Sequence, residues 1–147
     1  MLYVDTSVLV ALCTNEPKTA VVAAWYAQCT DDLASAAWCV TEFASALGLK
    51  QRTGQLTQAQ AHVAWLQFER LCANDLLLLS VKAGTFHRAA ELTMDSETGL
   101  RAGDALHLAC ALQAKAQGIA TLDVLIAKNA RLLKLKPVPI DKAKHSP

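Results

Sequence analysis

The chain has 147 residues, of which 53% are hydrophobic and 18% are charged, and this composition excludes an intrinsically disordered protein. The length is that of one domain, with enough residues to bury a substantial core. Fourteen basic and thirteen acidic side chains give a net charge of +1, which by itself argues against a strongly basic nucleic-acid-binding protein.

Two other classes of protein are also excluded. The longest stretch without charged residues, Thr53 to Phe68, contains four glutamines and a histidine, so it does not resemble a membrane-spanning helix. An acid at position 5 with no basic residue before it argues against a signal peptide. The five cysteines form no C-x-x-C pair, which favours reduced thiols and a cytoplasmic location over a disulfide framework.

Short β-prone runs alternate with segments of helical periodicity along the chain. Strands are predicted at residues 2–4, 33–35, 76–81, 119–122 and 137–140. Helices are predicted at residues 6–12, 17–29, 38–50, 57–72, 82–94, 104–117 and 123–133. The apolar run 76–81 indicates a strand covered on both faces, and the prolines in 137–140 indicate a sheet edge. This alternation predicts a single α/β domain with a mostly parallel sheet.

Acidic residues recur where predicted strands end and helices begin. Asp5 follows the first strand, Asp123 follows the fourth, and Asp104 begins a helix. Glu42 lies in a helix among mostly apolar neighbours, with no basic residue within seven positions. Because ligand sites in open parallel sheets form at the carboxyl ends of the strands, we expect these acids to gather there.

Carboxylates gathered in this way repel one another and stay ionised together only around a cation. Hard oxygen ligands select Mg²⁺ or Mn²⁺ over zinc, and phosphodiester hydrolysis is the natural reaction of such a site. Simpler interpretations remain open. Asp5, Asp104 and Asp123 each suit a helix N-terminus, and Glu42 is also compatible with pairing to a distant arginine.

Four segments, in order along the chain, resemble the motifs of the PIN domain family. They are YVDTSVLVAL at residues 3–12, TEFASAL at 41–47, LRAGDALHLA at 100–109 and TLD at 121–123. The resemblance extends from residue 2 to about residue 140. Within that family the chain resembles the VapC-type ribonuclease toxins of bacterial toxin–antitoxin pairs.

The resemblance implies a PIN-like three-layer α/β/α sandwich with a central, mostly parallel five-stranded sheet. We expect this domain to occupy residues 1–141 and to be followed by a short basic tail at 142–147. The resemblance also implies a Mg²⁺-dependent endoribonuclease in which Mn²⁺ can substitute. The four acids of the family fall on Asp5, Glu42, Asp104 and Asp123, with Asp5, Asp104 and Asp123 as metal ligands and Glu42 orienting a water or serving a second metal.

Small hydroxyl residues accompany these acids. Thr6 and Ser7 match the family's hydroxyl residue after the first acid, and Thr121 matches the one before the last. One departure concerns the residues after the fourth acid, where relatives often carry basic side chains. Here Val124 and Leu125 follow Asp123, so RNA contacts at that turn are in doubt.

Two further residues lie near the third acid. Arg101 precedes it by three positions and is a candidate contact for substrate phosphate, with an ion pair to Glu97 as the alternative. His107 lies one helical turn after Asp104 and is expected to be packed and hydrogen-bonded rather than catalytic.

The resemblance implies three kinds of partner: an RNA substrate, a VapB-type antitoxin in a hydrophobic groove formed by the helices between residues 17 and 73, and a second copy in a homodimer. The alternative function is a catalytically silent PIN-like module that binds RNA or protein. Charge is unevenly distributed, with six basic residues and one acid after position 123. That distribution allows a nucleic acid close to the acidic site despite the near-neutral total.

Overall fold

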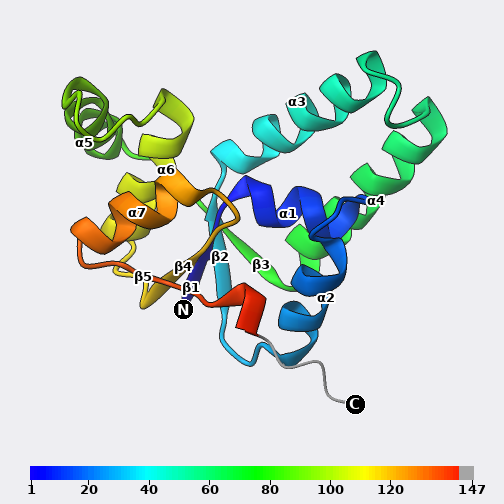
Figure 1. The fold of residues 1–147 in the computed structure, drawn as a ribbon, viewed down its shortest axis with the longest axis horizontal. Helices are drawn as coiled ribbons and strands as arrows, with labels where there is room; N and C mark the ends of the chain where they lie inside the picture. The colour runs from blue at the N-terminus through cyan, green and yellow to red at the C-terminus, as the bar shows by residue number, and fades with distance from the viewer. Residues whose placement is uncertain (143–147) are drawn as a thin grey trace.

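One sheet of five parallel strands organises the molecule (Figure 1). The computed structural model describes residues 1–142. The strands are β1 (Leu2–Val4), β2 (Leu33–Ala36), β3 (Leu76–Leu79), β4 (Gly118–Ala120) and β5 (Lys136–Pro137). Their order across the sheet is β3-β2-β1-β4-β5, and every neighbouring pair is parallel. The predicted α/β class and the number of strands are confirmed.

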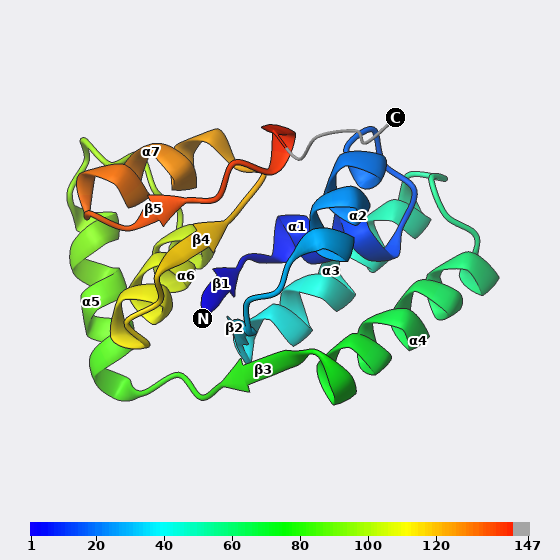
Figure 2. The same ribbon diagram turned by 90° about the horizontal axis from the view of Figure 1, so that it is seen from below.

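Helices cover both faces of this sheet. They are α1 (Thr6–Cys13), α2 (Thr19–Gln28), α3 (Trp38–Arg52), α4 (Gln58–Asn74), α5 (Ala83–Met94), α6 (Ala102–Gln113) and α7 (Val124–Leu132), with a final 3₁₀ turn η1 (Ile140–Lys142). One apolar core joins α1–α4 to the sheet and a second joins α5–α7 to it (Figure 2). Alternate residues of β1 enter the two cores, Val4 the first and Tyr3 the second, as the period of a strand requires. The three layers are those of the predicted sandwich.

Two predictions about strands are wrong. The apolar strand β3 is not covered on both faces, because Leu77 is 60% exposed. The strand lies at one side of the sheet, next to β2 only. An apolar run shows that a strand is hydrophobic but does not show its place in the sheet. The last strand covers only Lys136–Pro137, because two closely spaced prolines lack the N–H groups that a longer ladder needs.

Helix α6 also differs from its predicted bounds. It begins at Ala102, so Asp104 lies within its first turn instead of starting it. It ends at Gln113, four residues before the predicted end, and Lys115 then adopts a left-handed backbone with φ of 53°. A residue with positive φ soon after the last turn is a common way to end a helix.

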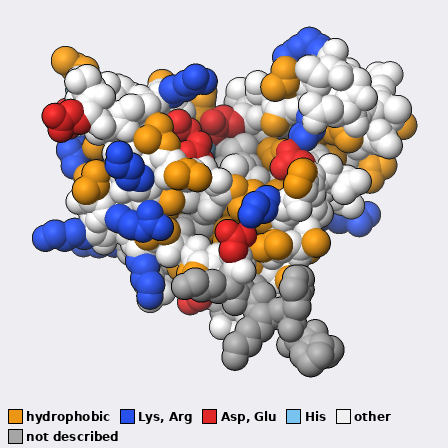
Figure 3. Space-filling view, in the orientation of Figure 1, with side chains coloured by type: hydrophobic (Ala, Val, Ile, Leu, Met, Phe, Trp, Pro, Cys, Tyr) orange, Lys and Arg blue, Asp and Glu red, His pale blue; other side chains and the backbone are white. Residues whose placement is uncertain are grey.

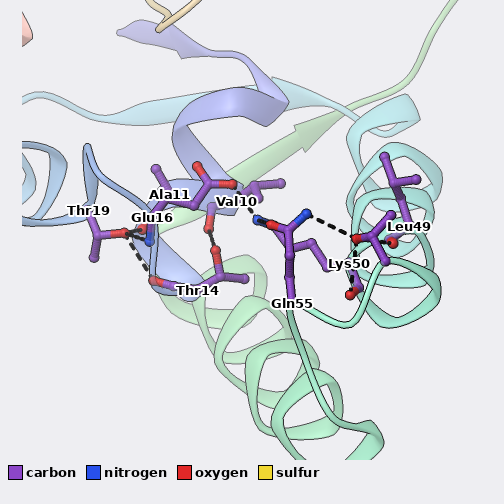
Figure 4. A network of polar contacts seen from close by, with 9 residues as sticks. Val10, Ala11, Thr14, Glu16, Thr19, Leu49, Lys50 and Gln55 are labelled. Atoms are coloured by element: carbon purple, nitrogen blue, oxygen red, sulfur yellow. Dashed lines mark hydrogen bonds and ion pairs between the residues drawn. The ribbon is translucent and has the colours of Figure 1, made fainter.

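Helices α3 and α4 form a hairpin that projects beside α1 (Figure 1). Stacked rings hold the pair together, with the centroids of Phe43 and Phe68 4.2 Å apart. At the far end, Lys50 Nζ lies 2.7 Å from Glu16 Oε1 and joins α3 to the loop after α1 (Figure 4). Thr19 ties that loop to α1 through a hydrogen bond to the carbonyl oxygen of Ala11. These contacts set the position of one wall of the cleft described below.

Three remaining expectations concern the chain as a whole. Within residues 1–142, no helix combines the length and apolar character needed to cross a bilayer. All five cysteines are free thiols. The predicted basic tail at 142–147 lies, from residue 143 onward, outside the described part of the chain.

Candidate active site

The carboxyl ends of two central strands bring two of the predicted acids together. Strands β1 and β4 are neighbours, with Val4 in register with Ala120. Asp5 follows β1, and its backbone N–H donates to the carbonyl oxygen of Ala120 at 3.1 Å. Asp123 follows β4 and caps α7. Asp5 and Asp123 therefore lie together at the carboxyl ends of the strands, as expected.

Asp5 is buried and held by three donors. Its Oδ1 accepts from Ser7 Oγ at 2.5 Å and from the backbone N–H of Val8 at 3.3 Å, while Oδ2 accepts from Thr121 Oγ1 at 2.5 Å. Burial is the largest influence and raises the pKa of Asp5, although these hydrogen bonds and nearby His107 oppose the rise. The hydroxyl residues Ser7 and Thr121 thus orient this carboxylate.

The loop between β4 and α7 is fixed by the same hydroxyl groups. Ser7 Oγ accepts from the N–H of Leu122 at 3.0 Å, and Thr121 Oγ1 accepts from the N–H of Asp123 at 3.0 Å. Asp123 Oδ1 in turn accepts from two N–H groups in the first turn of α7, as an N-cap does. Its Oδ2 has no hydrogen-bond partner among residues 1–142 and so remains available as a ligand.

Asp104 reaches the same region from α6. Burial raises its pKa first, and the negative charges of Asp123 and Asp5 raise it further. Three acids from three different elements are therefore within electrostatic reach of one another. Repulsion of this kind is relieved when a cation binds between the carboxylates.

Glu42 lies on α3 and faces the first turns of α1 and α6 across the site. Its Oε1 accepts from Thr6 Oγ1 at 2.7 Å and also contacts Nε2 of His107. Burial alone would raise the pKa of Glu42, but the contacts with His107 and Thr6 outweigh burial and place it below its ordinary value. The alternative of a distant arginine partner is thus wrong.

His107 is packed and hydrogen-bonded, as expected, and is 2% exposed. Its link to Glu42 was not predicted. The available signal was its spacing from Asp104, because residues three apart on a helix share one face. The sequence contained no comparable signal for the contact with α3.

An open cleft of about 830 Å³ lies between α1, α3 and the start of α6. Thr6, Ser7, Glu42, Gly103 and Asp123 contribute to its lining. Figure 3 shows this hollow between the two sides of the molecule, with acidic side chains gathered in it.

A second hollow of about 460 Å³ shares Lys18 and Asp123 with this cleft and adds Arg131. Arg101, exposed at the start of α6, forms no ion pair within residues 1–142, so the alternative pairing with Glu97 is not seen. The mouth of the site therefore combines central acids with basic side chains at its margins.

The donor chemistry of this site suits a hard divalent cation. Nowhere in the described part of the chain do three or more His, Cys, Asp or Glu side chains form a ready-made metal cage. Mg²⁺ does not require one, since proteins commonly hold it through one or two carboxylates while it keeps several waters. Asp104 and the Oδ2 atom of Asp123 are carboxylate oxygens of the kind that such an ion takes.

Comparison with protein families decides where this arrangement belongs. Residues 2–134 match the PIN domain. The chain belongs to the PIN domain family. The resemblance seen in its four sequence motifs is thereby confirmed. In this PIN domain, the four motif acids lie on α3, α6 and the ends of β1 and β4.

Solved structures agree on the fold. The PIN domain is similar to VapC20 of Mycobacterium tuberculosis, a sarcin–ricin loop cleaving toxin, with 19% identity, a TM-score of 0.71, and coverage of 88% of this chain and 95% of that one. It is also similar to FitAcB of Neisseria gonorrhoeae, with 20% identity, a TM-score of 0.70, and coverage of 97% and 99% respectively. No curated protein sequence matches the chain. At these identities the structural likeness establishes the fold.

Proposed function

We propose that this PIN domain is a Mg²⁺-dependent endoribonuclease and the toxin of a toxin–antitoxin pair. The observation that carries the proposal is the approach of Asp123 and Asp5 to Asp104 at the carboxyl end of the sheet, close enough to raise the pKa of Asp104 beyond the effect of burial, beside an open cleft. Family membership supports a nuclease, and the fold shared with VapC20 and FitAcB supports the toxin role.

Asp5, Asp104 and Asp123 would hold the Mg²⁺ or Mn²⁺ ion. When bound, such a cation neutralises charge on a phosphoryl oxygen and lowers the pKa of a coordinated water. Ser7 and Thr121 keep the Asp5 carboxylate in one orientation and offset part of its burial cost. That geometry supports the supporting roles predicted for these two hydroxyl residues.

Glu42 serves the water rather than the metal in this proposal. Thr6 and His107 occupy its Oε1, so its Oε2 is the atom that accepts a hydrogen from a water in the cleft. That water attacks the phosphorus atom in line and displaces the 3′ oxygen. The products are a 5′-phosphate end and a 3′-hydroxyl end.

The RNA backbone would continue from the cleft into the hollow beside α7. Lys18, which pairs with Asp141 at 3.1 Å, and Arg131 line that hollow and offer cations to phosphates next to the scissile one. Arg101 offers a further phosphate contact at the start of α6. Val124, directly after Asp123, is apolar and 84% exposed, so it offers no charge to phosphate. In this proposal Arg131, further along α7, makes the phosphate contact that basic residues make directly after the fourth acid in relatives.

A VapB-type antitoxin would occupy the apolar hollow between the end of α1 and α4. This hollow measures about 530 Å³, Leu12, Leu56 and Val63 line it, and Val63 is 55% exposed. An amphipathic helix fits such a groove. We further propose a homodimer acting in the cytoplasm, where its RNA substrate is found. Co-expression with the neighbouring reading frame should yield a complex that Val63→Asp weakens.

Cleavage of purified RNA in Mg²⁺ tests the nuclease directly. We expect Asp5→Asn and Asp104→Asn to lower the rate at least a hundredfold, the usual cost of disrupting a site built on electrostatic stabilisation. Asp31→Asn is a matched control, because Asp31 is exposed before β2, at the opposite edge of the sheet. Parent rates in Asp5→Asn or Asp104→Asn would refute the proposal.

A catalytically silent module that only binds RNA or protein is distinguished by metal binding. Calorimetric titration with Mn²⁺ should give saturable binding to the wild-type protein that is lost in Asp5→Ala. RNA binding without cleavage and without Mn²⁺ binding would favour the silent module instead.

A further inference from the structure

Glu42 ends a chain of buried polar groups, of which the proposed mechanism uses only the contacts of Thr6 and His107 with Oε1. Tyr3 is fully buried at 0% exposure, and its Oη lies 2.7 Å from Nδ1 of His107. The backbone N–H of Ala36 donates to the same Oη at 3.1 Å. Nε2 of His107 then contacts Oε1 of Glu42, and Thr6 Oγ1 lies 3.1 Å from that nitrogen. Polar groups this deep are costly unless every one of them is paired.

The donor and acceptor inventory of this chain favours one arrangement of hydrogens. A carboxylate only accepts, so the contact with Glu42 requires a hydrogen on Nε2 of His107. The oxygen of Tyr3 accepts from Ala36, and a neutral imidazole with its hydrogen on Nε2 leaves Nδ1, 2.7 Å away, to accept the hydrogen of Tyr3. In a neutral imidazole one nitrogen donates and the other accepts, and the two neighbours match that division.

We propose that Tyr3 fixes His107 in the Nε2–H tautomer, and that the two act as positioning residues that hold the Glu42 carboxylate in one orientation. This inference rests on the proposed function, because it concerns how Glu42 orients the attacking water. With Oε1 occupied by donors from Thr6 and His107, Oε2, which lies beside the indole N–H of Trp38, is the oxygen that accepts from the substrate side.

The surroundings of Oε2 agree with this division of the two oxygens. A Cβ atom built on Gly103 would lie 2.9 Å from Oε2 and 3.5 Å from Nε1 of Trp38, and both glycine and tryptophan line the cleft. Oε2 therefore faces the cleft, while Oε1 faces the buried chain. The Tyr3 and His107 rings also pack edge to face with centroids 5.7 Å apart, which leaves the imidazole little freedom to rotate.

Nitrogen NMR of the metal-free protein tests the tautomer without any need for activity. We expect the ¹⁵N shifts of His107 to indicate a protonated Nε2 and an unprotonated Nδ1. The resonances are assigned by their loss in His107→Gln. Shifts that indicate a protonated Nδ1 would overturn the inference, both in the Nδ1–H tautomer and in the imidazolium ion, which is protonated on both nitrogens. In Tyr3→Phe, which keeps the ring and removes the hydroxyl, the His107 shifts should move toward a tautomer mixture.

Steady-state kinetics test the positioning role with two replacements of His107. The amide nitrogen of Gln approximates Nε2 and can still donate to Glu42, whereas the shorter Asn places its amide near Nδ1 and cannot reach. We expect His107→Asn to lower kcat about a hundredfold with little change in KM, the size of effect that misplacing a reacting group by about 1 Å produces. His107→Gln should recover at least tenfold of that loss. His87→Gln, on exposed α5, is the control.

A purely structural role predicts a different result. It would lower folding stability in both His107 variants without separating their kcat values, and that outcome contradicts the inference. Absence of cleavage by the wild-type protein in Mg²⁺ would overturn the proposed function, and the positioning role with it, whatever the NMR shifts indicate. The tautomer measurement therefore distinguishes failure of the chain of hydrogen bonds from failure of the proposed function.

Discussion

Thr121 Oγ1 donates a 2.5 Å hydrogen bond to Oδ2 of Asp5, although 116 residues separate the two along the chain. The bond joins the ends of the neighbouring strands β1 and β4. Its acceptor is a buried carboxylate whose remaining hydrogen bonds are local, from Ser7 and Val8. One hydroxyl group thus connects the folding of the sheet edge with the orientation of the first acid of the site.

Replacing this hydroxyl should reduce both stability and activity. Thr121→Val keeps the shape and removes the donor, and hydrogen bonds to charged groups contribute about 1.5–3 kcal/mol. We expect a loss of that size in the free energy of unfolding, measured by urea titration, with at least a tenfold fall in RNA cleavage. Thr121→Ser retains the oxygen and should restore most of both. Wild-type stability in Thr121→Val would show that the bond does not orient Asp5.

Asp104→Asn should stabilise the metal-free protein while it abolishes function. The pKa of Asp104 is raised in the folded state. Its favourable contribution to the free energy of unfolding is therefore present below the unfolded-state pKa, and it is lost as the pH rises through the folded-state pKa. At pH 7 the ionised side chain therefore destabilises the fold, chiefly because it is partly buried and also because it lies near Asp123 and Asp5. In EDTA we expect Asp104→Asn to raise the free energy of unfolding by about 0.5–1 kcal/mol. The gain is modest because the side chain is partly exposed and water screens its charge. Excess Mg²⁺ should stabilise the wild-type protein but not the variant, and equal Mg²⁺ stabilisation of both would contradict this.

Glu42 should behave in the opposite sense with pH. Its folded-state pKa is lowered despite burial, so its contribution is present above the unfolded carboxyl pKa and is lost as pH falls through the folded value. We expect wild-type protein to exceed Glu42→Gln in stability by about 1 kcal/mol at pH 7. Urea unfolding between pH 7 and pH 3 should show this gap closing below about pH 4.3, the ordinary glutamate value. A gap that widens on acidification would contradict the assignment.

Gly103→Ala should separate activity from stability. The new methyl group would meet Oε2 of Glu42 at 2.9 Å, and this oxygen cannot retreat easily because Thr6 and His107 hold the other. Alanine is favoured over glycine by about 1 kcal/mol in a helix interior and by less in the first turn, where Gly103 lies, and this preference offsets part of the clash in stability. We therefore expect a near-unchanged thermal midpoint with at least a tenfold lower kcat. Gly84→Ala, where nothing lies within 4 Å of the added atom, is the control.

The basic residues beside α7 should be detectable through salt dependence. Each phosphate contact on a single strand contributes about 0.7 to the slope of log affinity against log salt concentration. In an Asp104→Asn background that does not cleave, we expect Lys18→Gln and Arg131→Gln each to reduce the slope by about that amount. Arg88→Gln, which removes a cation paired with Glu91 on α5, should leave the slope unchanged. Identical slopes in all four proteins would exclude this hollow as the RNA path.

The order of elements and the positions of three acids were predictable because both depend on local patterns. A strand followed by a helix places the intervening residue at the carboxyl end of the strand, and Asp5 and Asp123 occupy that position. Asp104 lies in the first turn of α6, close to its predicted place. In parallel sheets these ends share one edge, so their meeting needed no knowledge of strand order.

The sequence by itself determined that this chain is an α/β domain with acids at one sheet edge, because strand and helix periods and short-range spacing are local properties. Only the tertiary structure decided which distant groups these acids meet. Glu42 is hydrogen-bonded to Thr6 and His107, 36 and 65 residues away along the chain. Strand β3 lies at the side of the sheet, next to β2 only. Such pairings depend on how separate elements pack, and packing distances are not encoded in the spacing of residues along the chain.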